Sequence, residues 1–219
     1  MSYELFISAF VSLFVVVDPF GTAAVFAVLT GAMASAEKRK VAIKAVLIAV
    51  SIMLVFSAVG RTLLEYMHIS LPAFRVAGGL LLFITAFRMI MGFHDPDQLN
   101  SEKTAYKDRS DIAVFPLAIP MLAGPGVMTA VIMFSTAAHT MVEHVQVTAA
   151  IVIVQVLALL SLLGASKLGK FFGATGNSII ARIMGILLAA MAVQFMADGI
   201  TELFRLRDFP ALIPDIMQG

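Results

Sequence analysis

The sequence predicts an all-α integral membrane protein of six transmembrane helices, arranged as two inverted three-helix repeats with the first and fourth helices broken at the bilayer midplane. Composition indicates the class, because 60% of the residues are hydrophobic and 13% are charged, against about 45–50% apolar residues in soluble domains. The apolar runs are also continuous, whereas strands of a membrane barrel would alternate over about 10 residues. Two proline breaks and a repeated pattern indicate the arrangement.

Six apolar runs are each long enough to cross a hydrocarbon core of about 30 Å, which takes about 20 helical residues. They lie at residues 4–34, 41–64, 71–93, 112–137, 143–166 and 178–204. The first run has no basic segment before it and is too long for the apolar part of a signal peptide. We therefore expect it to be retained as a span.

The spans divide into repeat one (1–93), a polar linker (94–111), repeat two (112–204) and a tail (205–219). Basic residues gather around the links after the first, third and fifth spans: Lys38, Arg39, Lys40, Lys44, Lys103, Lys107, Arg109, Lys167, Lys170 and Arg182. Links rich in Lys and Arg stay in the cytoplasm. We therefore expect these three links to be cytoplasmic and both termini to lie outside.

The first span contains a charge and a helix breaker at Asp18-Pro19. A carboxylate at the centre of a transmembrane helix costs roughly 2.5–3.5 kcal/mol on insertion scales, and proline clashes with the preceding turn. Both residues fit if one helix ends at Val17 and a second begins with Pro19, with Asp18 as its N-cap. Broken backbone at membrane depth needs surrounding protein or a cavity, and in transporters it often forms the substrate site.

A repeated pattern relates the two halves of the chain. The stretch 75–81 (Arg-Val-Ala-Gly-Gly-Leu-Leu) resembles 182–188 (Arg-Ile-Met-Gly-Ile-Leu-Leu) at an offset of 107 residues, and this register aligns Met89 with Met196. Pro19 and Pro125 are 106 residues apart, so we expect the fourth span to break at Pro125. An odd number of spans per repeat requires the halves to be inverted. The alternative is chance similarity among helices rich in Leu, Ala and Gly.

Inversion would bring the N-termini of the two second half-helices together. Each N-terminus has unpaired N–H groups and about half a positive charge, which suits an anion. Asp18 caps the first, whereas the sequence Gly-Pro-Gly at 124–126 leaves the second bare. A zwitterion fits this asymmetry, with its carboxylate on the N–H groups after Pro125. Its ammonium would bind Asp18 and the carbonyls left free at residues 15–17 and 119–122.

The predicted substrate-binding residues lie at and just after the two breaks. They are Asp18, Pro19, Gly21, Thr22, Gly124, Pro125, Gly126 and Thr129. Apolar walls are expected from Phe20, Phe26 and Met128. Structural alternatives exist, since Asp18 can act as a cap alone, threonines bond back to their own helix and glycines permit close helix approach.

Five further polar residues lie on the third and sixth spans. Arg88, Gln194 and Asp198 are candidates for gating or for pairing between helices. Arg88 and Asp198 lie one turn from their helix ends, where headgroup contact is the alternative, whereas Gln194 either points to the cavity or hydrogen-bonds a neighbouring helix. Arg75 and Arg182 occupy equivalent repeat positions near helix starts. Long basic side chains at such positions reach the headgroups, so we expect both to be anchors.

Enzyme chemistry finds no support in the sequence. There is no Cys, no His pair at zinc spacing that is backed by an inward-facing Glu, no phosphate-binding loop and no nucleophile elbow. The net charge of +1 indicates no nucleic-acid partner. We therefore expect no catalysis, no metal and no cofactor. The coupling ion stays open, with a proton on Asp18 as one option.

Three stretches carry a recognisable signature: Val-Asp-Pro-Phe-Gly at 17–21, Phe-Pro-Leu-Ala-Ile-Pro-Met-Leu-Ala-Gly-Pro-Gly at 115–126 and Gln-Phe-Met-Ala-Asp-Gly-Ile at 194–200. They resemble the MarC/SnatA family of bacterial inner-membrane proteins, and the resemblance covers nearly the whole chain. The resemblance implies a six-span fold related to the LysE-type exporters. It also implies transport of small neutral amino acids such as glycine and alanine, which characterised members of the family move. The family pattern continues with an Asn and a Pro where this sequence reads Thr22-Ala23-Ala24.

The sequence therefore predicts a secondary transporter of small neutral amino acids in the bacterial inner (plasma) membrane. The substrate is held between the broken first and fourth helices, and the lipid bilayer surrounds the protein. Two other classes stay open. One is a non-transporting membrane scaffold or subunit, for which no ligand would change stability, and the other is an exporter of drug-like compounds, which needs a wide apolar cavity.

Overall fold

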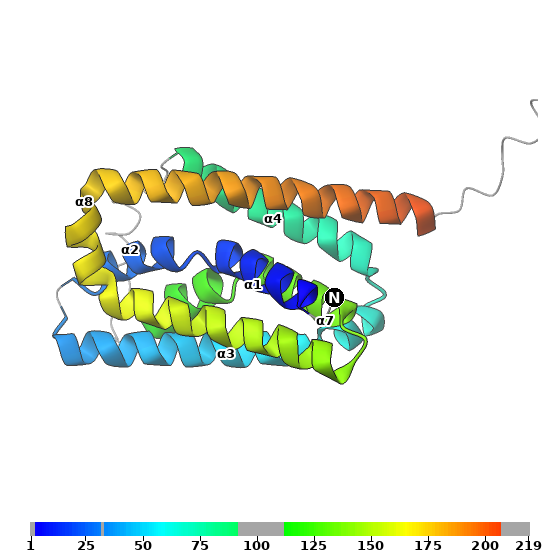
Figure 1. Ribbon diagram of the computed structural model, residues 1–219, viewed down its shortest axis with the longest axis horizontal. Helices are drawn as coiled ribbons and strands as arrows, with labels where there is room; N and C mark the ends of the chain where they lie inside the picture. The colour runs from blue at the N-terminus through cyan, green and yellow to red at the C-terminus, as the bar shows by residue number, and fades with distance from the viewer. Residues whose placement is uncertain (1–2, 32, 92–111, 207–219) are drawn as a thin grey trace, which may run out of the picture.

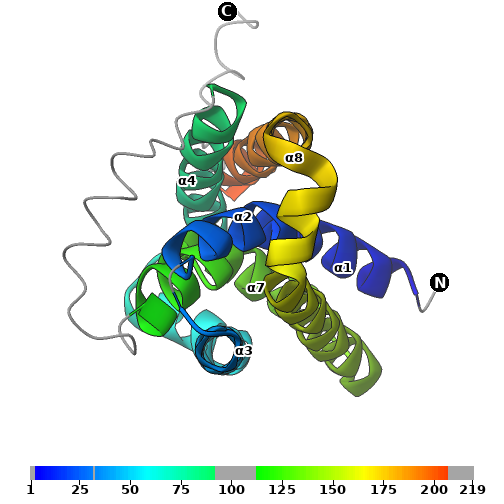
Figure 2. The same ribbon diagram turned by 90° about the vertical axis from the view of Figure 1, so that its left-hand side faces the viewer.

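The computed structural model describes residues 3–31, 33–91 and 112–206, and within these ranges it contains helices and no strand. The helices are α1 (Glu4–Val17), α2 (Pro19–Leu29), α3 (Ser35–Tyr66), α4 (Leu71–Met91), η1 (Ala113–Leu122), α7 (Pro125–Ala137) and α8 (Met141–Leu206). They form a bundle of long, roughly aligned helices, in which α1 and α2 lie between α3 on one side and α4 on the other (Figures 1 and 2).

The described helices match the predicted multi-pass membrane protein. Five stretches are long and apolar enough to cross a membrane, and a sixth span results if η1 and α7 count as one. α1 and α2 together form the first span, Glu4–Leu29, and α8 contributes two, Met141–Ala165 and Ala181–Arg205. The all-helical class is therefore confirmed for the described residues, and their apolar helices are consistent with a multi-pass membrane protein.

The long helix α8 reverses direction between its two spans. Figure 1 shows its yellow part turning at one end of the bundle and its orange part running back. A straight helix of 66 residues would be roughly 100 Å long, so the reversal is what lets both parts pack in one bundle. The sequence predicts a link at 167–177, and the backbone there is helical. The predicted linker 94–111 and the tail beyond residue 206 lie outside the described residues.

α3 presents a stripe of small residues to the core. Ala42, Ala45 and Ala49 have no exposed surface, and their spacing of three and four places them on one face of the helix. Small residues let membrane helices approach closely. Leu47 and Val55 on the same helix are 61% and 56% exposed, which indicates a face turned to lipid.

The last span of α8 packs antiparallel to α4 through glycines. A methyl group added at Gly79 would lie 2.7 Å from Met196 Cγ, and one at Gly185 would lie 3.0 Å from Met89 Cβ. Both distances are shorter than ordinary van der Waals contact, so the glycines permit this close approach. The two contacts occur in opposite order along the helices, which establishes the antiparallel direction.

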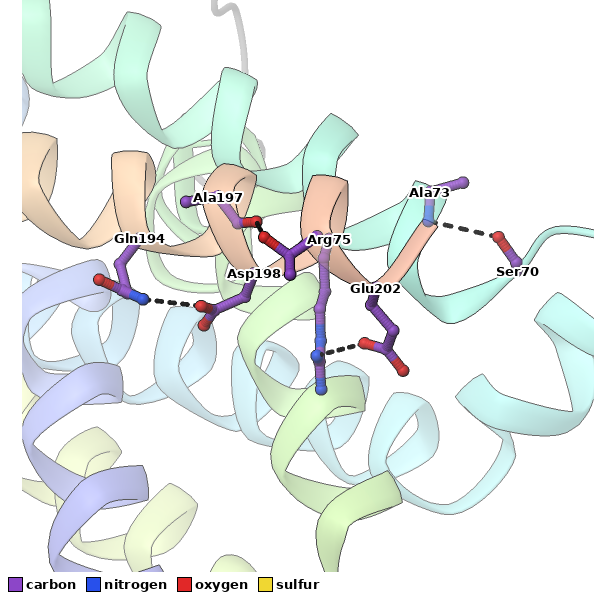
Figure 3. Close-up of polar contacts among 8 residues, drawn as sticks. Ser70, Ala73, Arg75, Gln194, Ala197, Asp198 and Glu202 are labelled. Carbon is purple, nitrogen blue, oxygen red and sulfur yellow. Dashed lines mark hydrogen bonds and ion pairs between the residues drawn. The ribbon is translucent and has the colours of Figure 1, made fainter. Parts of the chain in front are cut away.

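An ion pair closes one end of the contact between α4 and α8. Arg75 Nη1 donates to Glu202 Oε2 over 2.8 Å (Figure 3), and the side chains are 22% and 42% exposed. The sequence predicts Arg75 as a headgroup anchor, and the structure places its guanidinium in a pair between two helices. A partly exposed pair of this kind contributes about 1 kcal/mol or less, so glycine packing dominates this contact.

Candidate functional site

The break in the first span is centred on Asp18. Its N–H donates to Phe14 O over 3.1 Å at the end of α1, and its Oδ1 accepts from Gly21 N–H over 3.1 Å at the start of α2. The prediction that Asp18 caps a helix beginning with Pro19 is therefore confirmed. Its backbone is left-handed (φ 45°, ψ 71°), a conformation that Asp and Asn adopt more readily than other residues with a Cβ.

Gly21 leaves room for the capping carboxylate. A methyl group added there would overlap the carboxyl group of Asp18. The carboxylate could then no longer reach the N–H group at this position. The sequence Asp-Pro-x-Gly is therefore one local unit. Asp18 supplies the capping carboxylate, Pro19 is the first helical residue, and Gly21 donates its N–H group and leaves room for the carboxylate.

The break in the fourth span is more irregular. η1 and α7 meet at a bend of 52°, and Phe115 and Ile119 inside η1 have extended backbones, as expected of residues that precede proline. Ala123 N–H donates to Ala118 O, five residues earlier, over 2.9 Å. η1 therefore ends in a wide turn rather than in a regular α-helical one.

The N-terminus of α7 is uncapped, as the sequence predicts. Gly124 is the N-cap residue and makes no side-chain cap, and Pro125 is the first helical residue. The first N–H groups of a helix have no partner within the helix. Because Pro125 has no N–H group, those of the first turn of α7 belong to Gly126 and Val127. No described residue accepts a hydrogen bond from these two N–H groups outside the helix, so this end of α7 presents bare N–H groups and the positive end of the helix dipole.

A cavity of about 450 Å³ lies between the two breaks. The first break contributes Val16, Val17, Asp18, Gly21 and Thr22. The second contributes Pro120, Met121, Gly124, Pro125, Gly126 and Val127. α4 and α8 complete the wall with Leu81, Leu82, Ile84, Thr85, Arg88, Met89 and Leu188. Among the described residues of this lining, Asp18 and Arg88 are the charged ones, and most of the remainder is apolar.

The cavity brings together most of the predicted binding residues. Asp18, Gly21, Thr22, Gly124, Pro125 and Gly126 line it, and Pro19 and Thr129 do not. Thr129 is buried and its hydroxyl donates to Pro125 O over 2.9 Å. Thr22 Oγ1 donates to Val17 O over 3.2 Å, so its proton is used within the first break and its oxygen keeps only acceptor capacity.

Most of the residues predicted as apolar walls or gates lie outside the cavity. Phe20 packs edge to face on Phe14 with ring centroids 6.1 Å apart, and neither Phe20, Phe26 nor Met128 lines the cavity. The apolar wall comes largely from α4. Gln194 Nε2 donates to Asp198 Oδ1 over 2.7 Å along one exposed face of α8 (Figure 3), outside the cavity.

Two carbonyls that the sequence predicts to be free are occupied. Val17 O accepts from the Thr22 hydroxyl, and Leu122 O accepts from Gln155 Nε2 over 3.2 Å. The prediction is therefore wrong at these two positions. The physical reason is that a buried carbonyl without a partner costs about 1–3 kcal/mol, so nearby donors pair with it.

Gln155 is a residue of the site that the sequence analysis missed. It lies in the first span of α8 with no exposed surface, and its Nε2 contacts both Leu122 O and Met53 Sδ, the latter at 3.0 Å. It thereby fixes the end of η1 two residues before Gly124. A single amide in the apolar run 149–163 was the available signal, because polar residues inside spans usually face the bundle interior.

Substitutions of Gln155 should follow an order set by its two polar atoms. Its Oε1 is buried and accepts no hydrogen bond from the described residues, so Gln155→Leu loses only the Nε2 donor with its contacts to Leu122 O and Met53 Sδ. Gln155→Glu loses that donor and adds a buried acidic group, which costs more. We expect the unfolding temperature in detergent to fall further for Gln155→Glu than for Gln155→Leu. Equal falls for the two variants would contradict this account.

Comparison with known proteins agrees with the motifs. A family model described as MarC family integral membrane protein matches residues 3–204. UPF0056 membrane proteins of Methanocaldococcus jannaschii and Aquifex aeolicus are each 36% identical over 200 and 202 residues, covering 91% and 92% of this chain and 98% and 94% of the relatives. The UPF0056 membrane protein YhcE of Escherichia coli is 32% identical over 203 residues, covering 92% of this chain and 94% of that protein.

No solved structure matches the chain. The family model nevertheless covers both breaks and the whole lining of the cavity. The relatives align along nearly their full lengths. The chain therefore belongs to the MarC family of integral membrane proteins.

Proposed function

We propose that the protein is a secondary transporter of small neutral amino acids in the bacterial inner membrane, with its substrate bound in the cavity between the two breaks. The observation that carries this proposal is the presence of a buried carboxylate, Asp18, and an uncapped helix N-terminus on the same cavity. The substrate ammonium pairs with Asp18. Its carboxylate accepts from the N–H groups of Gly126 and Val127.

The remaining lining supports a neutral substrate. A volume of about 450 Å³ lies in the range of small-molecule sites, roughly 300–1,000 Å³. Leu82, Met89 and Met121 offer apolar surface to the substrate side chain. A charged side chain would lose its hydration against these three residues, none of which can pair with a charge. Aliphatic amino acids are therefore favoured over acidic and basic ones.

An inverted repeat is part of the same proposal. If a two-fold axis exchanges α4 with the last span of α8, each contact between the two helices has a second, symmetry-related contact in which the aligned residues exchange places. The repeat register aligns Met196 with Met89 and Gly79 with Ile186. The contact of Gly79 with Met196 has a counterpart in the contact of Gly185 with Met89. Gly185 is one residue before Ile186, the residue that the register aligns with Gly79. This reciprocity supports the relation that the repeated pattern suggests.

The test is uptake of labelled alanine and glycine by proteoliposomes, compared with empty liposomes, with and without an imposed pH gradient. We expect saturable uptake that unlabelled glycine inhibits. Stimulation by the gradient would identify a proton as the coupling ion. Absence of uptake, with no stabilisation by any amino acid, would favour the membrane scaffold. Stabilisation by drug-like compounds alone would favour the drug exporter.

A further inference from the structure

We propose that Arg88 binds the substrate carboxylate at the mouth of the cavity, before the carboxylate reaches the N-terminus of α7. This inference rests on the proposed function and adds a binding residue that determines specificity. Selection for a free carboxylate would then begin at the entrance, so that molecules lacking one enter poorly.

The position of Arg88 on α4 supports this role. Leu81, Thr85 and Arg88 are spaced by four and three residues, which places them on one face of the helix, and all three line the cavity. Leu82 on the same wall faces the first turn of α7, since a methyl group added at Gly126 would overlap its side chain. Arg88 is six residues further along, about 9 Å at 1.5 Å per residue. The part of α4 that lines the cavity therefore extends from Arg88 to Leu82, beside the first turn of α7.

Burial distinguishes the two ends of the cavity. Asp18 is 9% exposed, whereas Arg88 is exposed. Arg88 also borders a second hollow of about 390 Å³ with Phe83, Ile84 and Phe87. Arg88 therefore borders two hollows and is exposed, which places it nearer the surface of the bundle than Asp18. Asp18 is thus the deep end of the cavity and Arg88 the outer end.

The charge of Arg88 is available for a ligand. Within the described ranges, Arg88 makes no hydrogen bond or ion pair, in contrast to Arg61 and Arg75, which pair with Glu65 and Glu202. A guanidinium presents a planar set of donors that matches a carboxylate with two parallel hydrogen bonds. With Asp18, the described part of the lining carries one charge of each sign, as a zwitterion requires.

The test compares how strongly unlabelled alanine and alaninamide, which lacks the carboxylate, inhibit uptake of labelled alanine in proteoliposomes. A hydrogen bond to a charged group contributes about 1.5–3 kcal/mol, or roughly 10- to 150-fold. We expect Arg88→Gln to raise the KM for alanine about 10-fold or more with little change in kcat. The inhibition constant of alaninamide should stay unchanged, so the preference for alanine falls. Arg88→Lys should be intermediate, because an ammonium keeps the charge but not the paired geometry.

Arg182→Gln is the matched control, because Arg182 is an exposed arginine of α8 outside the cavity lining. It should leave KM and the preference unchanged. An unchanged preference for alanine in Arg88→Gln, or an equal loss of affinity for both compounds, would overturn the role of Arg88 while leaving the transporter proposal intact. Absence of uptake by the wild-type protein would instead reject the transporter proposal itself.

Discussion

Replacing Asp18 with Asn should lower amino-acid uptake by about 100-fold while leaving the protein folded. The side chain of Asn can accept the hydrogen bond from Gly21 N–H that Asp18 now accepts, and it is as good an N-cap. It also tolerates the left-handed backbone at this position. What is lost is the negative charge, and a charge-assisted bond to an ammonium is worth about 1.5–3 kcal/mol. Uptake of labelled alanine by proteoliposomes measures the loss of transport, and thermal unfolding in detergent checks that the variant is still folded.

Two further variants separate the charge from the cap. Asp18→Ala removes both and forces a left-handed backbone on alanine, so it should lose stability as well as uptake, by about 1 kcal/mol for the cap and about 1–2 kcal/mol for the backbone. Glu65→Gln removes an exposed carboxylate of α3 outside the cavity and should leave uptake unchanged. Full uptake by Asp18→Asn would reduce Asp18 to a helix cap.

The two breaks could be predicted because each has a local cause. Asp18, Pro19 and Pro125 fit a particular position at the start of a helix, whatever packs around them. The spans 143–166 and 178–204 predict a link at 167–177, but these residues contain glycines and no proline, so nothing there ends the helix. Proline is the stronger signal because it removes a donor and clashes, whereas glycine in a helix costs only about 1 kcal/mol.

The parts of the site that escaped prediction depend on contacts between distant residues. Gln155 and Leu122 are 33 residues apart, and Gln155 and Met53 are 102 apart. Neither contact leaves a spacing pattern in the sequence. The contribution of α4 to the cavity also depends on packing between distant parts of the chain, because Leu82 and Thr85 become part of a site only when α4 packs beside α7. Local chemistry thus predicts where the backbone breaks, and packing decides which side chains surround the breaks.

The same added methyl group should have different consequences at two glycines of the second break. At Gly126 it would overlap the end of the Leu82 side chain, whereas at Gly124 it would overlap the backbone oxygen of Pro120. A flexible side chain can move or be shortened, but a backbone oxygen held in the break cannot. We expect Gly126→Ala to lose about 1–3 kcal/mol of unfolding free energy through overpacking. Gly124→Ala should lose more and accumulate poorly as folded protein.

Shortening Leu82 provides the decisive comparison. Leu82→Ala alone leaves a hole and should cost about 2–5 kcal/mol, but in Gly126→Ala the new methyl group occupies part of that hole. The double variant should therefore be more stable than the sum of the single effects predicts, by about 0.5–3 kcal/mol, while Leu82→Ala should give Gly124→Ala no such relief. Unfolding in detergent measures both couplings. A Gly124→Ala protein as stable as the wild type would mean that the chain at Pro120 can move. In that case the N–H groups of α7 would not be held at a fixed place on the cavity, and the carboxylate site would have to form during binding.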